Sequence, residues 1–165
     1  MSTKISPFRR IVTGHDEHGR AIFRSIDQLQ PEIIPSGDAA FATIWSTGEV
    51  PVDLNDETDG RDRDVGLTLQ GGSVVRVVDM LPGSSSPMHR TNSIDYGIVV
   101  WGQVELELDN AAFETCRAGE VVVQRGTIHR WRNTSNTEVC RIVFVLTEAR
   151  GPYLHDGMPL DEVQP

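Results

Sequence analysis

The sequence predicts an all-β protein with one domain, and three observations support this class. Short runs rich in valine and isoleucine recur along the chain, and most of the 15 glycines and 9 prolines lie between them. Residues 104–108, VELEL, alternate strictly between apolar and polar, which is the period of a half-buried strand. The length of 165 residues suits one domain with its own core.

Composition and charge exclude several classes of partner. The net charge of −9 argues against nonspecific binding to nucleic acid or to an anionic membrane. No apolar run approaches the ~18 residues of a membrane span. The first ten residues carry charge but lack the apolar stretch of a secretory signal. We therefore expect a cytoplasmic protein with no nucleic-acid partner and no membrane partner.

The N-terminal part of the chain predicts a few strands and a long acidic loop. Residues 13–20, TGHDEHGR, are typical of a turn before a strand at 21–26, and two prolines predict a loop over 27–38. Residues 41–47 alternate as a half-buried strand does. The segment 49–72 is crowded with carboxylates that lack the spacing of a calcium loop, and its length indicates a flap near a site.

The middle of the chain predicts the main sheet structure. Residues 74–80, VVRVVDM, are apolar on both faces except at Arg76 and Asp79, as in a strand covered on both sides. In 104–108 we expect the valine and both leucines to point inward and both glutamates to point to solvent. Further strands are predicted at 96–101, 112–116, 120–124 and 139–146. Two of these hold the cysteines, Cys116 and Cys140, which we expect to be buried free thiols rather than a disulfide.

Two stretches carry the candidate chemistry, and each contains glycine and histidine at fixed spacing. The first is GSSSPMHRTNSIDYGIVVWG over 83–102, and the second is GEVVVQRGTIHRWRN over 119–133. They resemble the two motifs of the cupin family, G-x5-H-x-H-x(3,4)-E-x6-G and G-x5-P-x-G-x2-H-x3-N. The residues that match are Gly83, His89, Gly102, Gly119, Gly126, His129 and Asn133. The residues that depart are Thr91 at the second His, Asp95 at the Glu and Arg125 at the Pro.

The resemblance implies a double-stranded β-helix, the jelly-roll cupin barrel, with extra N-terminal strands. One copy of each motif implies one barrel. On this basis residues 1–72 form N-terminal strands and an acidic loop packed on the barrel, and residues 73–148 form the cupin barrel. Residues 149–165 form a C-terminal tail, which we expect to be loose or draped over a neighbour.

The resemblance also implies which side chains point into the barrel. These are His89, Asp95 and His129, with Thr91 at the position of the missing His. Strand period places Trp131 on the same face as His129, so this indole is expected to stack on a substrate ring. The candidate substrate-binding residues are Trp131, Arg76, Thr91, Val99, Met88, Phe144 and Asn133. Arg76 would pair with a substrate carboxylate if it points inward, and the alternative is an outward salt bridge.

Three hypotheses for the chemistry stay open. In the first, His89 and His129 act without a cofactor as general acid and base, and Asp95 orients one imidazole. In the second, His89, Asp95 and His129 weakly bind one divalent metal, Fe, Mn, Ni or Zn, as in a non-haem iron dioxygenase. In the third, the barrel binds a ligand without catalysis.

Longer runs resemble a subgroup of small, stand-alone cupins of bacteria and fungi. These runs are H-R-T-x-x-I-D-Y-x-I-V, V-V-V-Q-R-G-T-x-H-x-W-x-N and T-G-H-D-x-x-G-x-A. The likeness implies a small-molecule substrate and a lyase or isomerising reaction, such as decarboxylation, dehydration or cyclisation, on an oxygenated aromatic or polyketide-like compound. We also expect a homodimer, because the strand near residues 41–45 needs a covered face.

Overall fold

The computed structural model describes residues 5–66 and 68–164, and strands form nearly all of its regular structure. The predicted all-β class is confirmed. No helix in these residues is long and apolar enough to cross a membrane. The elements in chain order are β1 (Phe8–His15), β2 (Ala21–Leu29), β3 (Glu32–Ile33), β4 (Ala39–Thr47), the 3₁₀ helix η1 (Gly60–Asp62), β5 (Ser73–Met80), β6 (Ser93–Trp101), β7 (Gln103–Glu107), the 3₁₀ helix η2 (Asp109–Ala111), β8 (Phe113–Arg117), β9 (Val121–Arg125), β10 (Arg130–Arg132), β11 (Cys140–Glu148), β12 (Tyr153–His155) and β13 (Met158–Leu160).

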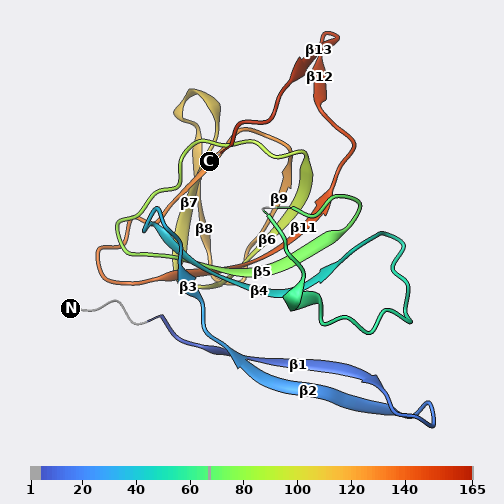
Figure 1. The fold of residues 1–165 in the computed structure, drawn as a ribbon. Coiled ribbons are helices and arrows are strands. Elements are labelled where there is room, and N and C mark those ends of the chain that lie inside the picture. The colour runs from blue at the N-terminus through green and yellow to red at the C-terminus, as the bar shows by residue number, and fades with distance from the viewer. Residues whose placement is uncertain (1–4, 67, 165) are drawn as a thin grey trace.

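Two antiparallel sheets form the walls of the barrel (Figure 1). The larger sheet has the order β3-β4-β5-β11-β6-β9, and the smaller has the order β10-β7-β8. The central strands β5 and β11 are the most continuously apolar runs of the sequence, because both faces of this sheet are covered there. The buried apolar side chains that form the core are Ala39, Val74, Val78, Met80, Val99, Val104, Cys116, Trp131, Cys140, Ile142, Phe144 and Leu146.

A glycine in β6 sets the position of an aromatic ring inside the barrel. Phe144 of β11 pairs with Arg76 of β5 on one side and with Gly97 of β6 on the other. A Cβ at Gly97 would lie 2.9 Å from the Phe144 ring. The ring can therefore lie against the β6 backbone only because this residue has no side chain.

Strand β7 departs in part from the predicted alternation. Val104 is buried as expected, but Glu107 is only 9% exposed, and Leu108 is exposed beyond the end of the strand. Arg130 lies opposite Glu107 in the register of β10 and donates two hydrogen bonds of 2.9 Å to its carboxylate. The prediction that both glutamates point to solvent is therefore wrong for Glu107, because a cross-strand arginine covers it.

The N-terminal strands form a hairpin below the barrel and an added edge of the large sheet (Figure 1). The predicted turn before residue 21 is confirmed, but β2 runs to Leu29 and β3 forms inside the predicted loop 27–38. Arg10 of β1 is buried and bonds the carboxylates of Asp27 in β2 and Asp59 in the acidic loop, each at 2.7 Å. This arginine joins the hairpin to the 49–72 segment.

The C-terminal tail, residues 149–164, forms a hairpin and then contacts the segment that follows His89. Strands β12 and β13 pair as an exposed hairpin. Beyond it, Val163 and Arg90 exchange two backbone hydrogen bonds, of 2.8 and 3.0 Å, and Glu162 accepts a bond from the Asn92 amide. The tail therefore fixes the segment that follows His89. The cysteines are buried free thiols, as predicted.

Candidate functional site: a cavity with paired imidazoles

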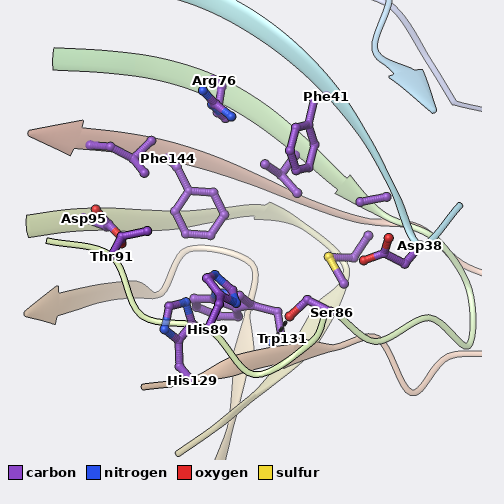
Figure 2. Close-up of a pocket in the computed structure, with 14 residues that line it drawn as sticks. Asp38, Phe41, Arg76, Ser86, His89, Thr91, Asp95, His129, Trp131 and Phe144 are labelled. Atoms are coloured by element: carbon purple, nitrogen blue, oxygen red, sulfur yellow. Dashed lines mark hydrogen bonds between the residues drawn. The ribbon is translucent and has the colours of Figure 1, made fainter. Parts of the chain in front are cut away.

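A cavity opens between the two sheets and has about 600 Å³ of empty space, its mouth included (Figure 2). The large sheet contributes the inward-facing residues Ala39, Phe41, Arg76, Val78, Met80, Asp95, Phe144 and Leu146. The remaining lining residues are Asp38, Ser86, His89, Thr91, His129 and Trp131.

His89 and His129 are brought together by a backbone bridge between the two motif stretches. The amide of each residue donates to the carbonyl of the other, at 2.8 and 2.9 Å. Residues opposite one another in an antiparallel pair place their side chains on the same face. The two imidazole centroids are accordingly 4.1 Å apart, with the rings tilted by 52°. The fold thus places side by side two histidines that are forty positions apart in the chain.

Both rings use the same nitrogen for structural support. His89 Nδ1 lies 3.0 Å from the carbonyl of Pro87, and His129 Nδ1 lies 2.9 Å from the carbonyl of Thr127. A carbonyl only accepts, so Nδ1 carries the proton in each ring and a neutral ring keeps a lone pair on Nε2. In the described residues, neither Nε2 is recorded in a hydrogen bond with protein. Burial, and then the neighbouring His89, lower the pKa of His129 from 6.5 to about 4, so this ring is neutral at pH 7.

Asp95 does not orient either ring, contrary to the sequence-based hypothesis, because backbone carbonyls already hold both Nδ1 atoms. Asp95 lies on β6 and is only 5% exposed. Burial raises the pKa of this carboxyl, while a hydrogen bond from Ser93 and the nearby His89 and Arg76 act in the opposite direction. Its Oδ1 has no hydrogen-bond partner among the residues that the structure covers.

Arg76 points into the cavity, so the alternative of an outward salt bridge is wrong. The side chain is 7% exposed, and its guanidinium carbon lies 5.6 Å from the centre of the Phe41 ring. Its Nη2 donates to the carbonyl of Gly66 in the acidic loop, which places that loop beside the cavity as the flap hypothesis expects. Burial lowers the pKa of the guanidinium, whereas Asp95 raises it. An arginine is charged at neutral pH even so.

Trp131 and Phe144 form an aromatic wall beside the imidazoles. The two rings meet edge to face with centroids 5.5 Å apart, and Trp131 meets His129 in the same manner at 6.2 Å. Thr91 also lines the cavity, and its hydroxyl shares a 2.8 Å hydrogen bond with Ser93. These contacts leave flat apolar surface next to the free Nε2 atoms.

Three predicted binding residues do not line the cavity. Val99 lies farther along β6 and is buried in the core. Met88 is half-buried next to His89, but its side chain is not part of the lining. Asn133 is buried and structural, since its amide donates to the carbonyls of Met80 and Glu138 at 3.0 and 2.8 Å.

Sequence reasoning missed several lining residues, chiefly Phe41, Met80 and Ser86. Period-two alternation from Arg76 would have found Val78 and Met80, once Arg76 was known to point inward. Phe41 belongs to a predicted strand, but nothing in the sequence shows that this strand joins the large sheet next to β5.

The predicted metal ligands do not form a complete set in this geometry. His89 and His129 present Nε2 atoms suited to a divalent ion. However, over residues 5–66 and 68–164 no three His, Cys, Asp or Glu side chains converge on a point that could hold a metal. Asp95 therefore does not complete the triad, and the Thr91 hydroxyl is bonded to Ser93. The acidic loop forms no calcium cluster within the same residues.

Comparison with known proteins gives a family match in the middle of the chain and relatives that match most of its length. The family model described as the cupin domain matches residues 76–146. Phomopsin biosynthesis cluster protein C' of Diaporthe leptostromiformis is 42% identical over 161 residues, which cover 93% of this chain and 85% of that protein. The cupin-domain-containing oxidoreductase fogC of Aspergillus ruber is 36% identical, over 88% of this chain and 75% of its own.

Among solved structures, the polyketide cyclase RemF of Streptomyces resistomycificus superposes with a TM-score of 0.51. It is 20% identical, and the match covers 77% of this chain and 82% of that one. At this identity the likeness concerns the fold alone. With the two-sheet topology it confirms the jelly-roll barrel.

Proposed function

Because this chain belongs to the cupin family, we propose that it is a small-molecule enzyme that transfers protons inside its barrel, with His129 as the general base. The observation that carries the proposal is the imidazole pair. Both Nδ1 atoms are held by backbone carbonyls, and the lowered pKa of His129 keeps its Nε2 available to accept a proton at neutral pH. The relatives named for biosynthesis clusters support a secondary metabolite as the substrate.

The proposed reaction is a lyase or isomerising step on an oxygenated aromatic or polyketide-like compound. His129 Nε2 takes a proton from a carbon next to a carbonyl, and the electron pair moves onto the carbonyl oxygen as an enolate. The Arg76 guanidinium in the same cavity neutralises that charge. Return of the proton to another carbon gives an isomer, whereas departure of a neighbouring hydroxyl as water gives a dehydrated product.

The apolar walls support this step in two ways. Trp131 and Phe144 offer flat surface to a planar substrate, and they exclude water from the developing enolate. The proton on His129 Nε2 passes to the free Nε2 of His89, whose ring centre lies 4.1 Å away, and His89 then returns it to the substrate. As proposed, the reaction requires no metal or other cofactor.

A second candidate is an oxidoreductase, favoured by the names of relatives such as fogC. Such a reaction requires an electron acceptor. In the described part of the chain, the paired Nε2 atoms of His89 and His129 are donors that suit a metal. Metal analysis of protein purified without a chelator separates the two candidates. One specific ion at full occupancy, with activity lost to chelator and restored by that ion, favours the oxidoreductase.

Hydrogen–deuterium exchange tests the proton-transfer proposal without a known product. The protein is incubated in heavy water with hydroxyaryl ketones and β-keto acids, and deuterium uptake at carbon is followed by NMR. His129→Ala should lower the exchange rate at least about 100-fold. His155→Ala, an exposed histidine of the β12–β13 hairpin, is the matched control and should exchange as the wild type does. Equal exchange by His129→Ala would refute the assignment of the base.

A further inference from the structure

Two buried charged side chains of the cavity have no ion pair with each other. Arg76 is 7% exposed and Asp95 is 5% exposed. Both belong to the described residues, and no nitrogen of Arg76 lies within 4.0 Å of an Asp95 oxygen. Arg76 Nε and Asp95 Oδ1 also lack any hydrogen-bond partner in residues 5–66 and 68–164. Each side chain therefore holds a polar atom that is cut off from protein partners.

Unpartnered polar atoms of this kind favour a bound ligand. A buried donor or acceptor without a partner costs about 1–3 kcal/mol, and more when it is charged. The other buried carboxylates of the barrel walls are paired, Asp79 with Arg141 and Glu107 with Arg130. Among the buried Asp, Glu and Arg side chains of the described residues, the two without an ion pair are thus the two that face the cavity.

The surface between these residues is apolar and aromatic. Arg76 and Asp95 lie on β5 and β6 with β11 between them, so their strands are about 10 Å apart. Figure 2 shows the Phe144 ring of β11 between Arg76 and the imidazole pair, with Asp95 beside it. A ligand that contacts both charged groups therefore lies across the Phe144 ring.

We infer that Arg76 and Asp95 form the recognition subsite for the polar end of the substrate, which carries an acidic oxygen and a neighbouring hydroxyl. The acidic oxygen, a carboxylate or enolate, accepts a hydrogen bond from Arg76, and the hydroxyl bonds the free oxygen of Asp95. The ring of the substrate packs on Phe144. This assigns the substrate to hydroxy acids of aromatic type or enolised β-keto acids, and it rests on the proposed function only in naming the bound compound as the substrate.

Three simple probes separate the contributions of the two residues by isothermal titration calorimetry. They are 2-hydroxybenzoate, which has both groups, and benzoate and phenol, which have one each. The wild type should bind 2-hydroxybenzoate most tightly. Arg76→Met should weaken the binding of both acids, 2-hydroxybenzoate and benzoate, at least about tenfold, because a charge-assisted hydrogen bond is lost. The binding of phenol should not change. Asp95→Asn should weaken the binding of 2-hydroxybenzoate and phenol, about 3- to 10-fold, and leave the binding of benzoate nearly unchanged.

The controls separate recognition from folding and from catalysis. Arg132→Met removes an arginine that pairs with Glu105 outside the cavity, and it should bind all three probes as the wild type does. The calorimetry measures only the binding of the three probes, so a failure of the deuterium-exchange experiment leaves this binding test intact. Arg76→Lys keeps the charge and should bind benzoate better than Arg76→Met, which provides a second variant if the methionine variant is unstable.

Two results would overturn the inference. The first is that wild type and Arg76→Met bind the acids with equal affinity, or that Arg76→Met loses as much affinity for phenol as for the acids. The other is loss of affinity only together with faster tryptic cleavage after Arg61 or Arg63. That result would mean that Arg76 acts by holding the acidic loop through its bond to the Gly66 carbonyl.

Discussion

The barrel and the β1–β2 hairpin are both antiparallel, yet different forces hold them. The barrel buries a continuous apolar core between its two sheets. The hairpin instead exposes Ile11, Phe23 and Ile26, which are 48%, 69% and 51% exposed, and is joined to the acidic loop through the buried Arg10. A two-stranded hairpin is marginal in water without further packing. The difference indicates that the barrel can keep its cavity while the hairpin opens.

The largest effect is expected from a cavity in the barrel core. Ile142 of β11 is fully buried, so Ile142→Ala should lower the free energy of unfolding by about 2–5 kcal/mol. Urea unfolding followed by circular dichroism measures this change. Val123→Ala, at an exposed site of β9, is the control and should change stability by less than about 0.5 kcal/mol. Similar values for both variants would mean that the core is not what stabilises the barrel.

A smaller and local effect is expected from the arginine that anchors the hairpin. Arg10→Met leaves the carboxylates of Asp27 and Asp59 without their shared partner. Amide hydrogen exchange should quicken in β1 and β2, while the amides of β5 and β11 keep their protection. Equal loss of protection in hairpin and barrel would show that the two regions unfold as one unit.

The two regions should also respond to acid in different pH windows. Hydrogen bonds from Arg10 lower the pKa of Asp59 from 3.8 to about 2, so the hairpin contact should persist above pH 4 and be lost as pH falls towards 2. His129 of the barrel has its pKa lowered from 6.5 to about 4. Between these values the unfolded chain binds a proton that the folded barrel does not, so barrel stability should decline from pH 6.5 down to about 4.

The pH dependence of catalysis is an independent test of the lowered pKa of His129. If His129 is the base, kcat/KM should fall on the acid side near pH 4 rather than near pH 6.5. A pH profile of the deuterium exchange, compared with the urea midpoint at each pH, measures both effects. An acid limb near pH 6.5 would contradict the role of His129 as the free base.

The smallest effect on unfolding is expected at the exposed face of the hairpin. We propose that a second copy of the chain covers Ile11, Phe23 and Ile26 in a homodimer, since contiguous exposed apolar side chains are typical of interaction surfaces. Phe23→Ser should weaken the dimer in analytical ultracentrifugation and leave the cavity intact. Thr13→Ser, the residue opposite Phe23 in the register, serves as control. A wild-type monomer at micromolar concentration would refute the homodimer.

The sequence predicted the barrel well because its signals are local. Glycine and histidine spacing located the two stretches that meet at His89 and His129, and strand period placed Trp131 beside His129. The sequence could not show that Arg76 points into the cavity. Strand β5 is apolar on both faces, so the alternation of its residues does not reveal which face lines the cavity. The C-terminal hairpin was missed for a related reason, since its side chains are exposed and show no apolar pattern.

Whether a residue lines the cavity depends on its position along the strand as well as on its face. The period-two alternation of side chains predicts only the face. Val99 and Asp95 share the inward face of β6, but only Asp95 reaches the cavity. Whether Asp95 could bind a metal together with His89 and His129 depended on the distances between the three chain segments that carry these residues. Local signals could therefore name these residues but could not set the distances between them.

The two buried thiols can report how often the barrel opens. Cys116 lies in the small sheet and Cys140 in the large one, and burial raises the pKa of Cys140 to about 12 and that of Cys116 as well. Thiol reagents attack the thiolate, which is scarce in the closed protein. Each modification event therefore records an opening of the barrel, and its rate would report how often the cavity walls part without any engineered label.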